Sequence, residues 1–179
     1  MTDGAQKARL LLKMALEQVV EVDQSMEQFD DEVEKAGKKL LGFVSALRTG
    51  KDLEKRLSGV AQLCDEARAA DPDAVLDDGT SGKHIRARAL MLRGLVYVHA
   101  TAGRGGLAAK ADLRKALEFM EEGVREAPTA EAYWSLSQVQ GRLGDRDAAI
   151  RSLRECISLD PNGRPAVEAA KQLRSLGAL

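Results

Sequence analysis

The side chains best suited to catalysis or metal binding are few and widely separated in this sequence. There are two histidines, His84 and His99, and two cysteines, Cys64 and Cys156. The histidines lie fifteen residues apart on one predicted helix, which separates them by roughly 22 Å along its axis. They therefore cannot share a metal ion within one chain, and no other motif supplies a nucleophile, a base or a metal site. The sequence predicts no catalytic residue, no metal and no cofactor.

The segment of residues 79–83 has the composition of a phosphate-binding loop but not its spacing. Two residues separate Gly79 from Gly82, where a Walker motif has four, and His84 stands where Ser or Thr should follow the lysine. Nucleotide binding is therefore not expected. Residues 73–83 as a whole are rich in Asp, Gly and Ser, and they predict a flexible linker between two helical segments.

Composition and charge indicate a helical protein without a polyanionic partner. The chain has 179 residues, of which 31% are charged, and its net charge is −1, so no nucleic-acid partner is expected. Cys64 and Cys156 both fall on apolar helical stripes, as reduced, packed thiols do. Lys13 and Glu17 interrupt the apolar N-terminal run, and no stretch is long enough for a membrane span. The sequence predicts a cytoplasmic protein that is not exported.

The longest predicted helical segment is at the N-terminus. Apolar residues recur every three or four positions from Ala8 to Leu47, with no proline among them. Capping side chains at residues 23–25 and 30–31 are the best candidates for a break, so this segment is one long helix or two end to end. The apolar stripe either packs on later helices of the same chain or pairs with a second protein. The acidic face of residues 17–34 predicts a solvated surface.

Residues 130–162 have the spacing of a helical hairpin. Small Ala149 allows two antiparallel helices to approach, Gly144 can adopt the left-handed conformation that ends a helix, and Pro161 stops the second helix. This order resembles the tetratricopeptide repeat, a helix-turn-helix unit of about 34 residues. Three positions depart from the family pattern: Tyr133, Ser137 and Gln140.

The resemblance implies further repeats earlier in the chain. Leu90, Gly94 and Tyr97 match the first-helix pattern of a repeat whose turn is lengthened by a glycine-rich insertion, with a flexible tip at Gly103, Gly105 and Gly106. Residues 36–72 are similar to a degenerate repeat, with a turn at residues 48–50 before the second helix. Pro165 begins a predicted helix that would cover the open end of the last repeat.

These features predict an all-α fold of antiparallel helix-turn-helix repeats stacked as a short superhelix. A long N-terminal helix precedes the repeats and a capping helix follows them. The predicted segments are a coiled-coil-like helix at 1–35, a degenerate repeat at 36–72, a flexible linker at 73–83, a repeat with an extended turn at 84–129, a regular repeat at 130–163 and a capping helix at 164–179.

In tetratricopeptide arrays the first helices of successive repeats line a concave groove that binds peptides or helices. The resemblance implies the following protein-binding residues: Arg88, Met91, Leu95, Val98, His99, Glu131, Trp134, Gln138 and Arg142. Trp134 beside Met91 and Leu95 would form a partly apolar anchor pocket, unless a terminal helix covers the tryptophan. Some family members bind a carboxylate with a clamp of Lys, Asn and Arg, and here Met91, Leu95, Ser135 and Gln138 replace most of it, so an apolar or mixed peptide is expected.

Two functions are compatible with these predictions. The first is an adaptor or chaperone-like scaffold that binds a segment of a protein partner, of unknown identity, in the groove. The second is a structural or assembly protein that forms a homodimer, or pairs with another coiled coil, through its long N-terminal helix. An enzyme is not expected.

Overall fold

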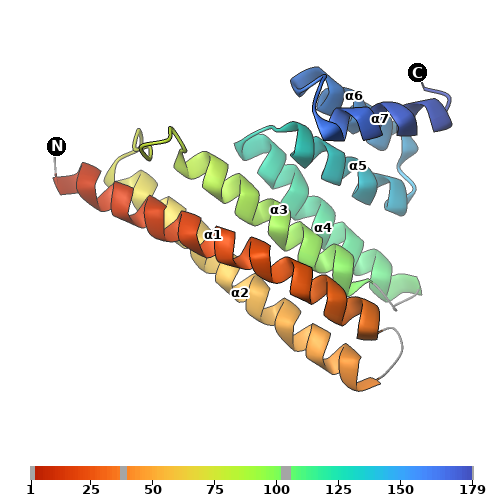
Figure 1. The fold of residues 1–179 in the computed structure, drawn as a ribbon, viewed down its shortest axis with the longest axis horizontal. Helices are drawn as coiled ribbons and strands as arrows, with labels where there is room; N and C mark the ends of the chain where they lie inside the picture. Colours follow the sequence, from red (N-terminus) through yellow and green to blue (C-terminus); the bar gives the residue numbers. More distant parts are fainter. Residues whose placement is uncertain (1–2, 37–39, 102–105, 179) are drawn as a thin grey trace.

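The computed structural model describes residues 3–36, 40–101 and 106–178, and in these residues the chain forms seven helices. Six of them pair as three antiparallel hairpins that stack in order along the chain, and the seventh closes the C-terminal end (Figure 1). The predicted all-α architecture of stacked helical hairpins is confirmed. The helices are α1 (Asp3–Ala36), α2 (Leu40–Ala70), α3 (Gly82–Ala100), α4 (Gly106–Glu126), α5 (Ala130–Leu143), α6 (Arg146–Leu159) and α7 (Arg164–Ser175).

The apolar stripe of α1 is buried within the same chain. Leu12, Val19 and Phe29 are each at most 2% exposed, and they share one core cluster with residues of α2 and α3. Burial of a large apolar side chain contributes about 1.5–3 kcal/mol, so this seam stabilises the first hairpin substantially. The stripe therefore packs on later helices of the same chain, which was one of the two alternatives that the sequence left open. The side chains of residues 36–47, where the predicted stripe ends, lie outside the described residues.

The prediction of a turn at residues 48–50, inside the degenerate repeat at 36–72, is wrong. Helix α2 continues through residues 48–50 without interruption, and its partner in the hairpin is α1. Gly50 is buried here, and a Cβ added to it would lie 3.3 Å from Cζ of Phe29. This glycine therefore allows α1 to approach α2 closely, and it does not end a helix.

The breaks proposed within the N-terminal segment are also absent, because α1 runs unbroken from Asp3 to Ala36. The hydroxyl of Ser25, one of the proposed caps, donates a hydrogen bond of 2.7 Å to the carbonyl oxygen of Glu21. Serine can make this bond to the preceding turn from inside a helix, so its presence does not imply an N-cap. The chain reverses direction between α1 and α2.

Close approach by glycine also defines the second hairpin. A Cβ added to Gly94 of α3 would lie 2.7 Å from Cγ of Met120 on α4, and one added to Gly123 would lie 3.1 Å from Sδ of Met91. The absence of side chains at these two positions brings the helix axes together. Of the glycine-rich tip predicted for this hairpin, Gly103 and Gly105 lie outside the described residues, whereas Gly106 is the first residue of α4, with φ of 69°.

The third hairpin has the glycine helix end that the sequence predicts at Gly144, and a side-chain N-cap on each of its helices. The amide of Ala132 donates to Oγ1 of Thr129, the N-cap of α5, and Gly144 ends that helix with φ of 88°. The amide of Ala148 then donates to the carboxylate of Asp145, the N-cap of α6. Helix α7 follows and packs on Leu153 of α6, forming the predicted cap at the C-terminal end.

The predicted linker at 73–83 contains a hydrogen-bonded turn. The amide of Leu76 donates to the carbonyl oxygen of Thr80 at 2.9 Å, and Gly79 occupies the left-handed region with φ of 83°. The Thr80 amide donates to the carboxylate of Asp78, which lowers the pKa of that side chain. These bonds place α3 directly after the turn, while the flexibility of the segment stays a prediction.

Candidate interaction groove

A groove of about 540 Å³ lies over α3, between α1 and α5. Its walls are largely apolar, with Met91 and Leu95 of α3 facing Ala132 of α5. Polar and charged side chains stand around these residues. The complete lining is Asp23, His84, Ala87, Arg88, Met91, Leu92, Leu95, Ala127, Thr129, Glu131, Ala132 and Ser135.

Helix periodicity explains why α3 presents these side chains together. Arg88, Met91 and Leu95 are spaced three and four residues apart, so they project from one face of the helix. Arg86, Arg93 and Tyr97 lie on the roughly opposite face, toward α2 and α4. The contacts that α3 makes with α2 and α4 therefore fix its rotation, and this turns Arg88, Met91 and Leu95 toward the groove.

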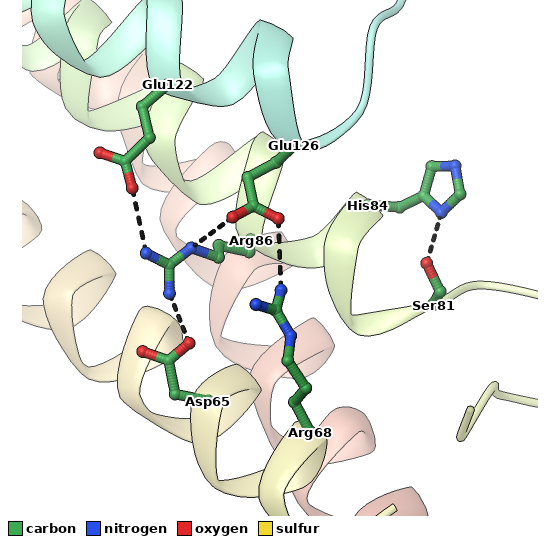
Figure 2. A network of polar contacts seen from close by, with 7 residues as sticks. All are labelled: Asp65, Arg68, Ser81, His84, Arg86, Glu122 and Glu126. Carbon is green, nitrogen blue, oxygen red and sulfur yellow. Dashed lines mark hydrogen bonds and ion pairs between the residues drawn. The ribbon is translucent and has the colours of Figure 1, made fainter. Parts of the chain in front are cut away.

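The first of these contacts is an ion-pair network centred on Arg86 (Figure 2). Its guanidinium lies 2.6 Å from Asp65 of α2, and 3.0 and 3.4 Å from Glu122 and Glu126 of α4. Arg68 of α2 also pairs with Glu126, at 3.2 Å. Burial alone would lower the pKa of Arg86, but its hydrogen bonds to Glu122 and Asp65 outweigh this and raise it. The network ties three helices together.

The second contact is an aromatic and ionic cluster about two to three helical turns after Arg86 on α3. The Tyr97 hydroxyl donates a hydrogen bond of 2.7 Å to Glu54 of α2, and its ring stacks on Phe119 of α4. Arg93 lies 4.0 Å from the centroid of the same Phe119 ring. Burial and then the bond to Glu54 raise the pKa of Tyr97 to about 12, so its hydroxyl stays a donor.

The charges at the groove come from all three of its helices. Arg88 of α3 donates a hydrogen bond to the carboxylate of Asp23, which fastens α3 to α1 at the edge of the groove. Glu131 is exposed in the first turn of α5. At the start of α3, Nδ1 of His84 lies 2.8 Å from the hydroxyl of Ser81 (Figure 2).

The structure brings together four of the nine residues that the sequence predicted for protein binding. Arg88, Met91, Leu95 and Glu131 all line the groove. The ring of His99 instead packs edge-on against Phe29 of α1, with centroids 6.0 Å apart, and Val98 packs against a core cluster formed by residues of α4 and α5. Both of these residues are half-buried.

The other three predicted residues lie on α5, outside the groove lining. The guanidinium of Arg142 donates to Oγ1 of Thr101 at 2.8 Å, and the amide of Gln138 donates to Gln172 of α7 at 2.8 Å. Trp134 is half-buried and packs with residues of α6 and α7, including Leu153 and Leu173. The C-terminal helix therefore covers part of the tryptophan, which was the alternative to an open anchor pocket.

Sequence reasoning missed Asp23 as part of the groove. Its signal was present, because Asp23 lies on the acidic face of residues 17–34, but nothing in the local sequence shows that this face borders α3. Thr129 and Ser135 were missed for a different reason. Thr129 is the N-cap of α5 and Ser135 lies in the second turn of that helix, and a small hydroxyl side chain at such a position has no local signal for a binding role.

Neither histidine nor cysteine chemistry is assembled in the described part of the chain. No group of three or more His, Cys, Asp or Glu side chains there could hold a metal ion. Cys64 and Cys156 are both buried, and burial raises the pKa of each thiol, that of Cys64 to about 11. The described helices also include none that combines the length and hydrophobicity of a membrane span.

The fold and groove define a helical-repeat array, in which the first helix of each hairpin faces a shared surface. Residues 130–162 match the model of the tetratricopeptide repeat family, so α5 and α6 form a tetratricopeptide repeat. Neither the curated proteins nor the solved structures include a match to this chain.

Proposed function

We propose that this protein is an adaptor or chaperone-like scaffold that binds a segment of a partner protein in the groove between α1, α3 and α5. The observation that carries the proposal is the largely apolar groove around Met91, beside a tetratricopeptide repeat. Repeats of this family form a protein-interaction fold, which supports binding over catalysis. An apolar surface rimmed by polar residues is typical of a site that receives another protein.

The binding residues supported best are those that line the groove. Met91 and Leu95 offer apolar contact, while Arg88 and Glu131 stand at the edges. A role for Trp134, Gln138, Val98, His99 or Arg142 requires contact with a partner outside this groove, because these residues do not line it.

The test is a selection of short random peptides on the immobilised full-length protein, followed by affinity measurements with the enriched sequences. Met91→Glu places a charge on the groove floor, and Ser135→Tyr fills the groove from α5 without adding charge. We expect either change to weaken binding of the selected peptides by about tenfold or more, because apolar anchors dominate such contacts.

A matched control distinguishes loss of binding from loss of fold. Lys110→Glu changes an exposed residue of α4 that does not line the groove, and it should leave binding unchanged. Circular dichroism and thermal melting establish that each variant is folded. Selected peptides that bind folded Met91→Glu and Ser135→Tyr as tightly as the unmodified protein would refute the proposal, and so would a selection that enriches no peptide.

The assembly function through α1 is the second candidate. The observation in its favour is a pair of exposed apolar side chains one turn apart on α1: Leu10 at 61% and Met14 at 41% exposure. The core-facing stripe of the same helix is already occupied by α2 and α3. Pairing through α1 would therefore have to use this small outer edge.

A further inference from the structure

The charged side chains around the groove are predominantly acidic. Its lining contains two carboxylates, Asp23 and Glu131, and one guanidinium, that of Arg88. Glu27 lies one helical turn after Asp23 on α1, on the same side of that helix, and its side chain is exposed. The groove is thus bordered by carboxylates from α1 on one side and from α5 on the other.

The one cation among the described lining residues is already engaged. The guanidinium of Arg88 bonds to Asp23, so these two charges compensate each other within the protein. Within the part of the chain that the structure describes, no cation pairs with Glu131 or Glu27, and both carboxylates are exposed to solvent. The apolar floor around Met91 and Leu95 therefore lies in a negative local potential, which attracts cations.

We infer that the occupant of the groove is a basic segment of a partner protein, with an apolar anchor flanked by Lys or Arg side chains. The apolar anchor contacts Met91 and Leu95, while the flanking cations face Glu131 on α5 and Glu27 on α1. This inference rests on the proposed binding function and adds the chemical class of the partner. An acidic segment would bring like charges together at both edges of the groove, which disfavours it.

The test uses the sequences and affinities of peptides selected on the full-length protein. Enriched peptides should combine one or two large apolar residues with adjacent Lys or Arg. A synthetic peptide of this kind should bind less tightly as salt rises, because exposed ion pairs are screened. The double variant Glu27→Gln with Glu131→Gln should weaken its binding roughly five- to tenfold at low salt, since each exposed pair contributes modestly.

The control removes the same number of charges elsewhere. Glu118→Gln with Glu155→Gln alters exposed carboxylates of α4 and α6 that do not line the groove, and peptide affinity should not change. A version of the peptide with Glu in place of each Lys or Arg should bind the unmodified protein weakly. That peptide should recover affinity on the double variant Glu27→Lys with Glu131→Lys.

Three results would overturn the inference. The selected peptides could have neutral or acidic flanks, or they could bind the Glu27→Gln and Glu131→Gln double variant as tightly as the unmodified protein. In both cases loss of binding to Met91→Glu would still support the groove, so only the charge preference would fail. A self-associated protein that Met91→Glu converts to monomer would identify the occupant as a second copy of this chain.

Discussion

Cys64 is buried at the contact between α2 and α3, and burial raises the pKa of its thiol to about 11. The nearby charge of Arg86 offsets only part of this effect. Because the thiolate is the reactive species, a thiol with this pKa is almost entirely protonated at neutral pH. The residue belongs to the core, as the sequence predicted from its place on an apolar stripe.

A labelling experiment measures this directly. In Cys156→Ala, which leaves Cys64 as the single thiol, we expect maleimide to react at least about a hundredfold more slowly with folded protein than with protein unfolded in urea. The folded protein's rate should keep rising with pH toward 11, whereas the unfolded chain's rate should level off near its ordinary pKa of 9.0. Equal rates in the two states would contradict the burial of Cys64.

Glycine positions determine how closely two helices pack, and α3 and α4 illustrate this at the scale of the element. We expect Gly94→Ala to destabilise the protein by about 1–3 kcal/mol, because the new Cβ would meet Met120 and the backbone oxygen of Ala116. Gly141→Ala is the matched control in α5, where an added Cβ meets nothing within 4 Å. That change should stabilise the protein by about 0.5–1 kcal/mol through helix propensity.

Urea unfolding, followed by circular dichroism, gives both free energies of unfolding. If Gly94→Ala were as stable as the unmodified protein, the close packing of α3 on α4 would be wrong. Destabilisation by Gly141→Ala would instead show that the surface of α5 at this position is occupied.

The difference between residues that act locally and residues that act through a distant partner explains which elements the sequence could predict. The hairpin of residues 130–162 and its break at Gly144 were predicted, because a left-handed glycine acts on the backbone within a few residues of itself. The N-caps Thr129 and Asp145 were not predicted, although they act as locally. Gly50 was interpreted as part of a turn, since its real role depends on Phe29, which is distant in sequence. A glycine that ends a helix and one that admits a neighbouring helix have the same local signature.

The groove residues also separate into those that the local sequence predicts and those that depend on contacts between distant elements. Arg88, Met91 and Leu95 follow from the periodicity of one helix and were predicted together. The contribution of Asp23 depends on where α1 lies relative to α3, and the partial covering of Trp134 depends on α7. These are packing relations between elements far apart in the chain, and periodicity within one element does not contain them.

For the whole molecule, the main consequence of the fold concerns oligomeric state. The apolar stripe of α1 could have formed a coiled coil with a second chain, but α2 and α3 bury it from Ala8 to Val33. A partner helix could reach this stripe only by opening the first hairpin and exposing its core. We therefore expect the purified protein to have the mass of one chain in light scattering after size-exclusion chromatography, across a wide range of concentration.

The outer edge of α1 provides the control for that measurement. Leu10→Gln with Met14→Gln removes the two most exposed apolar side chains of α1 and leaves the buried stripe intact. If the unmodified protein had the mass of two chains and this variant the mass of one, pairing through the edge of α1 would be established. A dimer that persists in this variant but dissociates in Met91→Glu would place the contact in the groove. A single-chain mass for all three proteins leaves the groove accessible to a different protein, as the adaptor function requires.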